Sequence, residues 1–138
     1  MSKILILIVE DEEATAEMYS NYFKQSGYEV DVSHDGLEGF EKMKAEQPAL
    51  VLMDIVMPGL SGMEVVEKAK HEHTTEKIPI IMLTNYSDSV ELKNALQQGA
   101  ADYIVKSELT PKQIVERVQR FIMPDENNKP NKHKYLAS

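Results

Sequence analysis

Five short apolar runs recur along the chain, and each is followed directly by a polar residue. The first, third and fourth are apolar at nearly every position, which is typical of strands buried on both faces of a parallel sheet. The second alternates apolar and polar residues and is interpreted as a shorter strand, and the fifth is interpreted as a strand as well. The predicted strands are Lys3–Val9, Tyr28–Val32, Ala49–Met53, Ile78–Leu83 and Ala101–Val105.

The segments between these runs carry apolar residues at helical spacing. The predicted helices cover about residues 12–26, 37–47, 61–70, 87–99 and 110–122. Ser61 is expected to cap the third helix, and Thr110 with Gln113 forms a capping-box pattern at the fifth. Strand and helix alternate five times, which predicts an α/β fold: a doubly wound (βα)5 three-layer sandwich around a parallel five-stranded sheet.

The length of 138 residues predicts one domain with room for a hydrophobic core. We expect this domain to span residues 1–123 and the polar residues 124–138 to form a disordered tail. The formal net charge is −8. Because the tail carries +1, the domain carries −9, which argues against a nucleic-acid-binding face.

Absences in the sequence narrow the function further. There is no cysteine, so disulfides, thiolate metal sites and cysteine nucleophiles are excluded. The apolar run Ile4–Val9 is too short to cross a membrane and lacks a cleavable signal pattern. The sequence therefore predicts a cytoplasmic protein that contacts neither membrane nor nucleic acid.

Polar side chains follow every predicted strand, and the carboxyl ends of parallel strands meet at one edge of a sheet, where ligands bind. These residues are Glu10 and Asp11 after the first strand, Ser33 and His34 after the second, Asp54 after the third, Thr84 after the fourth and Lys106 after the fifth. Ser33 and His34 are the less distinctive members.

The remaining five residues have a coherent chemistry. Three crowded carboxylates repel one another unless a hard cation such as Mg²⁺ binds among them, and a bound Mg²⁺ attracts a phosphoryl group. Lys106 can reach a phosphate oxygen, and Thr84 offers a hydroxyl donor. With no histidine or cysteine in this group, a carboxylate is left as the possible nucleophile, and carboxylates form aspartyl phosphates.

With these residues in this order, the chain resembles the receiver domain of two-component response regulators, of the CheY-like type. The resemblance covers Lys3 to about Ile122. It rests on the following motifs in order: Glu10-Asp11, Asp54 followed by Met57-Pro58-Gly59, Ser61-Gly62, Thr84, and Lys106 after Tyr103. The resemblance implies the strand order 2-1-3-4-5.

The resemblance also implies a role for each site residue. Asp54 would accept a phosphoryl group from a sensor histidine kinase or a phosphotransfer protein. Mg²⁺ would be held directly by Asp11, Asp54 and the backbone carbonyl of Val56, and through water by Glu10. Lys106, the Thr84 hydroxyl and the backbone at Val56 and Asn85 would contact the phosphoryl group.

Output is expected through a two-state switch. Thr84 would move toward the phosphoryl group and Tyr103 would turn inward, which changes the face formed by the fourth helix, fifth strand and fifth helix. A downstream protein would bind this face, with the chain acting as a monomer or weak dimer. The chain offers no room for an output domain beside the predicted one.

Two positions depart from the family pattern. Ser107 follows Lys106 where proline is usual, so the peptide bond is expected to be trans or strained, because a cis bond there costs about 2.5–4 kcal/mol. The residue after Thr84 is usually small, but here it is Asn85, which is followed by the bulky Tyr86. Both could shield the phosphoryl group from water, and we hypothesise slow self-dephosphorylation.

The sequence also allows structural explanations of these motifs and other functions. Structural explanations exist for each motif: a turn cap for Asp54, a polar helix start for Glu10 and Asp11, a strand end for Thr84, a solvated lysine for Lys106 and a static core aromatic for Tyr103. A pseudo-receiver scaffold that is never phosphorylated is one functional alternative. An aspartyl-phosphate phosphohydrolase is another, although Val56 stands where such enzymes carry a second Asp; we therefore do not expect a turnover enzyme.

Overall fold

The fold was determined as a computed structural model, which describes residues 3–85 and 90–123. Three sequence predictions fall outside these residues. They are the start of the fourth helix at about residue 87, the shielding role of Tyr86, and the disorder of residues 124–138.

In the described part of the chain, five strands form one sheet in the order β2-β1-β3-β4-β5. The strands are β1 (Leu5–Val9), β2 (Glu29–Ser33), β3 (Leu50–Asp54), β4 (Ile80–Thr84) and β5 (Asp102–Val105). Every neighbouring pair is parallel. The predicted parallel sheet and the implied strand order are both confirmed.

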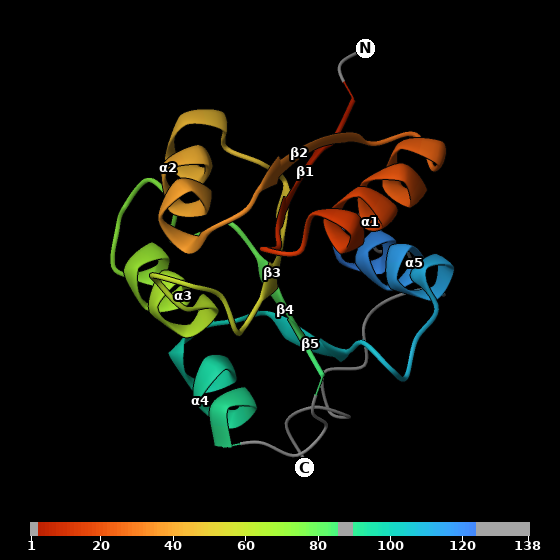
Figure 1. The fold of residues 1–138 in the computed structure, drawn as a ribbon. Coiled ribbons are helices and arrows are strands. Elements are labelled where there is room, and N and C mark those ends of the chain that lie inside the picture. The colour runs from red at the N-terminus through yellow and green to blue at the C-terminus, as the bar shows by residue number, and fades with distance from the viewer. Residues whose placement is uncertain (1–2, 86–89, 124–138) are drawn as a thin grey trace.

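Helices cover both faces of the sheet, as the alternation of strand and helix predicts (Figure 1). The helices are α1 (Glu13–Gln25), α2 (Gly36–Glu46), α3 (Gly62–Lys70), α4 (Val90–Gln98) and α5 (Pro111–Ile122). Figure 1 shows α1 and α5 on one side of the sheet and α2, α3 and α4 on the other. The result is the three-layer sandwich expected from the sequence.

Strand β3 shows why the sheet residues are apolar at every position. Leu50 and Leu52 belong to the core cluster on the α1 and α5 side, whereas Val51 and Met53 belong to the cluster on the α2, α3 and α4 side. All four side chains are fully buried. Because successive strand residues point to opposite faces, a strand covered on both faces has no polar side.

Two capping boxes fix where helices begin after the sheet. The Ser61 hydroxyl accepts a hydrogen bond from the Glu64 N–H at 3.2 Å, and Glu64 Oε1 accepts one from the Ser61 N–H at 3.2 Å. Thr110 and Gln113 make the same reciprocal pair, with Pro111 in the first turn. Both predicted caps are confirmed, and they set how the loops after β3 and β5 return toward the helices.

The strand boundaries differ slightly from those predicted. β4 begins at Ile80 and not at Ile78, because Pro79 has no N–H to donate to a sheet ladder. β2 begins after Tyr28, whose ring packs edge-on against Phe23 with centroids 5.9 Å apart. Tyr28 therefore serves the core between α1 and β2 instead of the strand.

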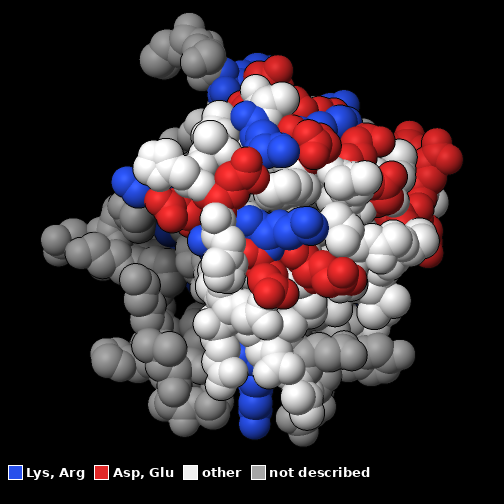
Figure 2. All heavy atoms as spheres, turned by 90° about the vertical axis from the view of Figure 1, so that its left-hand side faces the viewer, with Lys and Arg blue, Asp and Glu red and all other residues white. Residues whose placement is uncertain are grey.

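Charges of both signs cover the outer helix surfaces. Figure 2 shows acidic and basic side chains interspersed over the face that lies on the left of Figure 1. On α2, Lys42 pairs with Glu38 and Lys44 pairs with Glu41. None of the helices in the described residues is long and apolar enough to cross a membrane.

Candidate functional site

Asp54 is the last residue of β3 and is only 8% exposed. The loop that follows folds back against it, because the N–H of Gly62 donates to the carbonyl oxygen of Ile55 at 2.9 Å. A Cβ atom at Gly62 would lie 2.4 Å from the Asp54 carbonyl oxygen. Only glycine permits this close approach, so the Ser61-Gly62 element brings the loop directly against the strand end.

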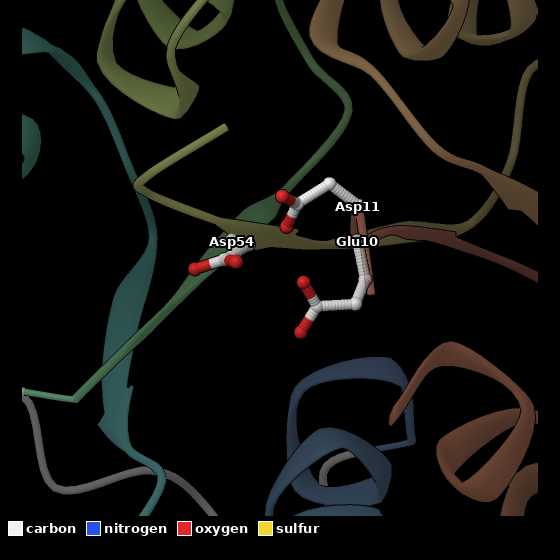
Figure 3. A group of neighbouring side chains, drawn as sticks. All are labelled: Glu10, Asp11 and Asp54. Carbon is white, nitrogen blue, oxygen red and sulfur yellow. The ribbon is translucent and has the colours of Figure 1, made fainter. Parts of the chain in front are cut away.

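Three carboxylates gather at the ends of β1 and β3 (Figure 3). Glu10, Asp11 and Asp54 each place one oxygen within 4.8 Å of the others. Glu10 is 1% exposed, whereas Asp11 is exposed and leaves one side of the group open to solvent. A set of hard oxygen donors that is open on one side fits Mg²⁺, which retains several of its waters when bound.

Lys106 reaches into the same group from the end of β5. Its Nζ atom lies 2.9 Å from Glu10 Oε1 and 3.6 Å from Asp54 Oδ2. Its main-chain N–H donates to the carbonyl oxygen of Thr84 at 2.7 Å. Strands β1, β3 and β5 therefore contribute charged groups to one site, although β5 is hydrogen-bonded to neither of the other two.

The charges in this group perturb one another. Burial raises the pKa of the Glu10 carboxyl, and its hydrogen bond with Asp54 raises that pKa further, against the lowering effect of Lys106. Burial alone would lower the pKa of Lys106, but the Glu10 and Asp54 carboxylates outweigh burial and raise it. The ammonium therefore stays charged, yet one lysine against three carboxylates leaves a net negative site that favours a cation.

Thr84, Asn85 and Val56 complete the edge. Thr84 ends β4, is 5% exposed and lies opposite Val105 in the parallel pairing with β5. Asn85 is exposed next to it, and the Val56 side chain is exposed two residues beyond Asp54. All the predicted site residues at strand ends therefore lie at the same edge of the sheet; their individual roles remain predictions.

Tyr103 lies further back, within β5, opposite Met82. Its side chain is half-buried and packs against the core cluster on the α2, α3 and α4 side. This placement suits both a static core aromatic and a side chain that turns. The inward rotation predicted from the family resemblance stays a prediction.

Two features of the structure gave little signal in the sequence, and only the first lies at the edge that holds the site. The Glu10 N–H donates to the Ser33 carbonyl oxygen at 2.9 Å, and His34 Nδ1 lies 3.1 Å from the Glu10 carbonyl oxygen, to which it donates. Asp102 is fully buried in β5, where its Oδ2 accepts hydrogen bonds from the Arg117 guanidinium at 3.0 Å. A strand-end position was the only hint of the first feature, and no pattern in the sequence indicated that Asp102 and Arg117 would pair.

The loop after Lys106 adopts the simpler of the two expected forms. Among the described residues every peptide bond is trans, so the bond between Lys106 and Ser107 is trans. The chain then turns at once, because the Glu108 N–H donates to the Val105 carbonyl oxygen at 3.0 Å.

Comparison with known proteins agrees with this geometry. Residues 6–119 match the response regulator receiver domain family. The DNA-binding response regulator MtrA of Mycolicibacterium paratuberculosis is 34% identical over 114 residues, which cover 83% of this chain and 49% of that protein. The phosphate regulon transcriptional regulatory protein PhoB of Rhizobium meliloti is 35% identical over 117 residues, covering 85% and 51%. The chain spans about half the length of these relatives.

Solved structures show the same fold. The chemotaxis protein CheY4 of Vibrio cholerae aligns with a TM-score of 0.80 at 26% identity, covering 86% of this chain and 98% of that one. A CheY-like receiver domain protein from Methanospirillum hungatei aligns with a TM-score of 0.80 at 30% identity, covering 88% and 94%.

Receiver domains are signalling proteins and not turnover enzymes, and they act with histidine kinases or phosphotransfer proteins. The family match covers most of this chain, the strand order is the one the family resemblance implies, and the acidic group and lysine lie at the expected edge. The chain belongs to the response regulator receiver domain family of two-component systems.

Proposed function

We propose that this chain is a phosphorylation-controlled response regulator, in which Asp54 accepts a phosphoryl group from a histidine kinase or phosphotransfer protein. The supporting observation is the arrangement around Asp54. Its carboxylate lies within 4.8 Å of the nearest Glu10 and Asp11 oxygens and 3.6 Å from the Lys106 ammonium. A nucleophilic oxygen, a set of metal ligands and a phosphate-pairing cation are thus next to one another.

In the proposed transfer, an Asp54 carboxylate oxygen forms a bond to phosphorus as the P–N bond to the donor's histidine breaks. The imidazole leaves with the electron pair of that bond and takes up a proton. Lys106 pairs with a phosphoryl oxygen, and the Thr84 hydroxyl donates to another. Backbone N–H groups at Val56 and Asn85 are further donors, as the resemblance implies.

The residues that would hold Mg²⁺ are those of the acidic group. As the resemblance implies, Asp11, Asp54 and the backbone carbonyl of Val56 would hold the ion directly, and Glu10 would hold it through water. When bound, Mg²⁺ supplies positive charge that offsets the negative charge of the phosphoryl group. Asp11 is the exposed member of the set, so the proposed metal site opens to solvent on its side.

We propose that the output is contact with another protein in the cytoplasm. Thr84 moves toward the phosphoryl group, Tyr103 turns inward, and the face formed by α4, β5 and α5 changes its shape for a downstream partner. Tyr103 is half-buried and packs against the core cluster on the α2, α3 and α4 side, so a rotation of its side chain would alter the surface there. The protein acts as a monomer or weak dimer.

A small phosphodonor such as acetyl phosphate tests the proposal. With MgCl₂, the wild type is expected to gain the mass of one phosphoryl group, measured on the intact protein. Asp54→Asn is expected to gain none, whereas Asp125→Asn, a matched Asp-to-Asn control, is expected to behave as the wild type. The same samples give the half-life of the phosphoprotein, and Asn85→Ala should shorten that half-life if Asn85 shields the phosphoryl group.

The outcome also separates the alternatives. A wild type that gains no phosphoryl group is a pseudo-receiver. Multiple turnovers of a phosphate ester would indicate a phosphohydrolase, but Val56 offers no carboxylate to act as acid and base two residues after Asp54. The intact acidic group and Lys106 favour the phosphorylated receiver.

A further inference from the structure

The Lys106 ammonium lies closer to Glu10 than to Asp54. The 2.9 Å contact with Glu10 Oε1 is a charge-assisted hydrogen bond, whereas 3.6 Å to Asp54 Oδ2 is a looser ion pair. Glu10 is 1% exposed and the Lys106 side chain is 18% exposed, so water screens the closer contact weakly. Of these two carboxylates, Glu10 is the stronger partner.

The main chain of Glu10 is fixed, and this gives its side chain a defined starting point. Its N–H donates to the Ser33 carbonyl oxygen at 2.9 Å, and its own carbonyl oxygen accepts from His34 Nδ1 at 3.1 Å. Both bonds attach Glu10 to the end of β2, on the side of β1 away from β5. Glutamate has one methylene more than aspartate, and this length carries the carboxylate toward β5.

The sequence around Lys106 explains why such an anchor matters. Ser107 is exposed and follows a trans peptide bond, and it lacks the ring with which proline fixes φ. The Lys106 main chain is tied to β4 through the Thr84 carbonyl oxygen, but this bond does not orient the four-carbon side chain. A partner for the ammonium itself is what fixes the direction of the lysine.

We infer that Glu10 is the positioning residue for Lys106: in the metal-free protein the Glu10 carboxylate, more than Asp54, holds the ammonium at the site. The importance of Lys106 rests on the proposed function. The contact is measured without metal or phosphodonor, so the inference and the proposed function can fail separately.

Acylation of lysines by an amine-reactive ester in metal-free buffer tests this inference on the full chain. The rate is read by mass spectrometry of the Lys106 peptide, with the exposed Lys112 as an internal reference. Glu10→Gln is expected to raise the Lys106 rate about fivefold, the effect of losing one modest hydrogen bond. Glu10→Asp should raise it less, since the charge stays but the arm is shorter. Asp54→Asn should also raise it less, because its contact is longer.

Glu13→Gln is the matched control, because it removes an exposed charge from the first turn of α1 and should leave the Lys106 rate unchanged. Far-UV circular dichroism checks the fold. If Glu10→Gln does not fold, the Lys106 acylation rate is compared between Glu10→Asp and the wild type. A wild-type rate in the Glu10 variant, or a larger increase in Asp54→Asn, overturns the inference. A wild type that acquires no phosphoryl group overturns the proposed function and leaves this contact standing.

Discussion

At the scale of residues, the position of Asp54 depends on a glycine eight residues later. Because a Cβ at Gly62 would lie 2.4 Å from the Asp54 carbonyl oxygen, Gly62→Ala must push the loop away from the strand end. We predict a free energy of unfolding lower by about 1–3 kcal/mol, the usual cost of overpacking. Phosphorylation by acetyl phosphate should also slow, since the loop carries Val56. Urea unfolding and intact-protein mass spectrometry measure the two effects.

Gly27 supplies the control for this prediction. Its φ is +96°, and a Cβ there would meet no other atom within 4 Å. Gly27→Ala should therefore lower the free energy of unfolding by about 1 kcal/mol or somewhat more, from backbone strain alone. Its phosphorylation rate should stay at the wild-type level. Equal phosphorylation rates in the Gly27 and Gly62 variants would contradict the idea that Gly62 shapes the site.

Individual residues also show where sequence reasoning ends. Asp54 and Lys106 could be assigned to one edge because each follows a buried run and the sheet is parallel. The pairing of Lys106 with Glu10 could not, since it joins residues 96 positions apart and depends on side-chain conformation. Asp102 was missed because a buried carboxylate and a solvated one look alike in a sequence.

At the scale of elements, the Lys42 side chain connects α2 to the edge strand β2 through hydrogen bonds. Its Nζ atom donates to the Val32 carbonyl oxygen at 2.7 Å and to Asp31 Oδ1 at 3.2 Å, and it pairs with Glu38 on its own helix. We predict that Lys42→Met lowers the free energy of unfolding at neutral pH by about 1 kcal/mol, since these groups are partly exposed. Urea unfolding measures this loss, and Lys68→Met, on an exposed part of α3, should change little.

The pH dependence of that loss follows from Asp31. Burial would raise its pKa, but hydrogen bonds from Glu46, the Val32 N–H and Lys42 outweigh burial and lower it. A lowered carboxyl pKa gives stability that is present above the ordinary value of 3.8 and is lost as pH falls through the folded-state pKa. The difference in the free energy of unfolding between wild type and Lys42→Met should therefore become smaller as the pH falls through that range. A gap that stays constant there would show that Asp31 is not the partner that matters.

Helices and strands were the most predictable level of this structure. A strand such as β3 is apolar on both faces because helices cover both, and this makes its position plain in the sequence. The boundaries moved where one residue had a second role. Tyr28 lies outside β2 because its ring packs against Phe23, and β4 begins only after Pro79, which has no N–H to donate.

At the scale of the whole molecule, the acidic edge links metal binding to stability. A ligand that binds only the folded protein stabilises it, by about 2.7 kcal/mol at a hundredfold excess over its Kd. We predict that MgCl₂ raises the Tm above that in NaCl of equal ionic strength. Asp11→Asn should lose most of this increase, whereas Glu13→Gln should keep it. The same increase in wild type and Asp11→Asn would place the bound Mg²⁺ elsewhere.

The contact between Glu10 and Lys106 also has a consequence for newly made chains. During synthesis the carboxylates of β1 and β3 leave the ribosome well before Lys106, which follows Glu10 by 96 residues. Until β5 has joined the far edge of the sheet, the acidic group lacks the Lys106 ammonium beside it. Under the proposed function, an unfinished chain is then a poor phosphoryl acceptor, and a kinase would modify only molecules whose last strand is in place.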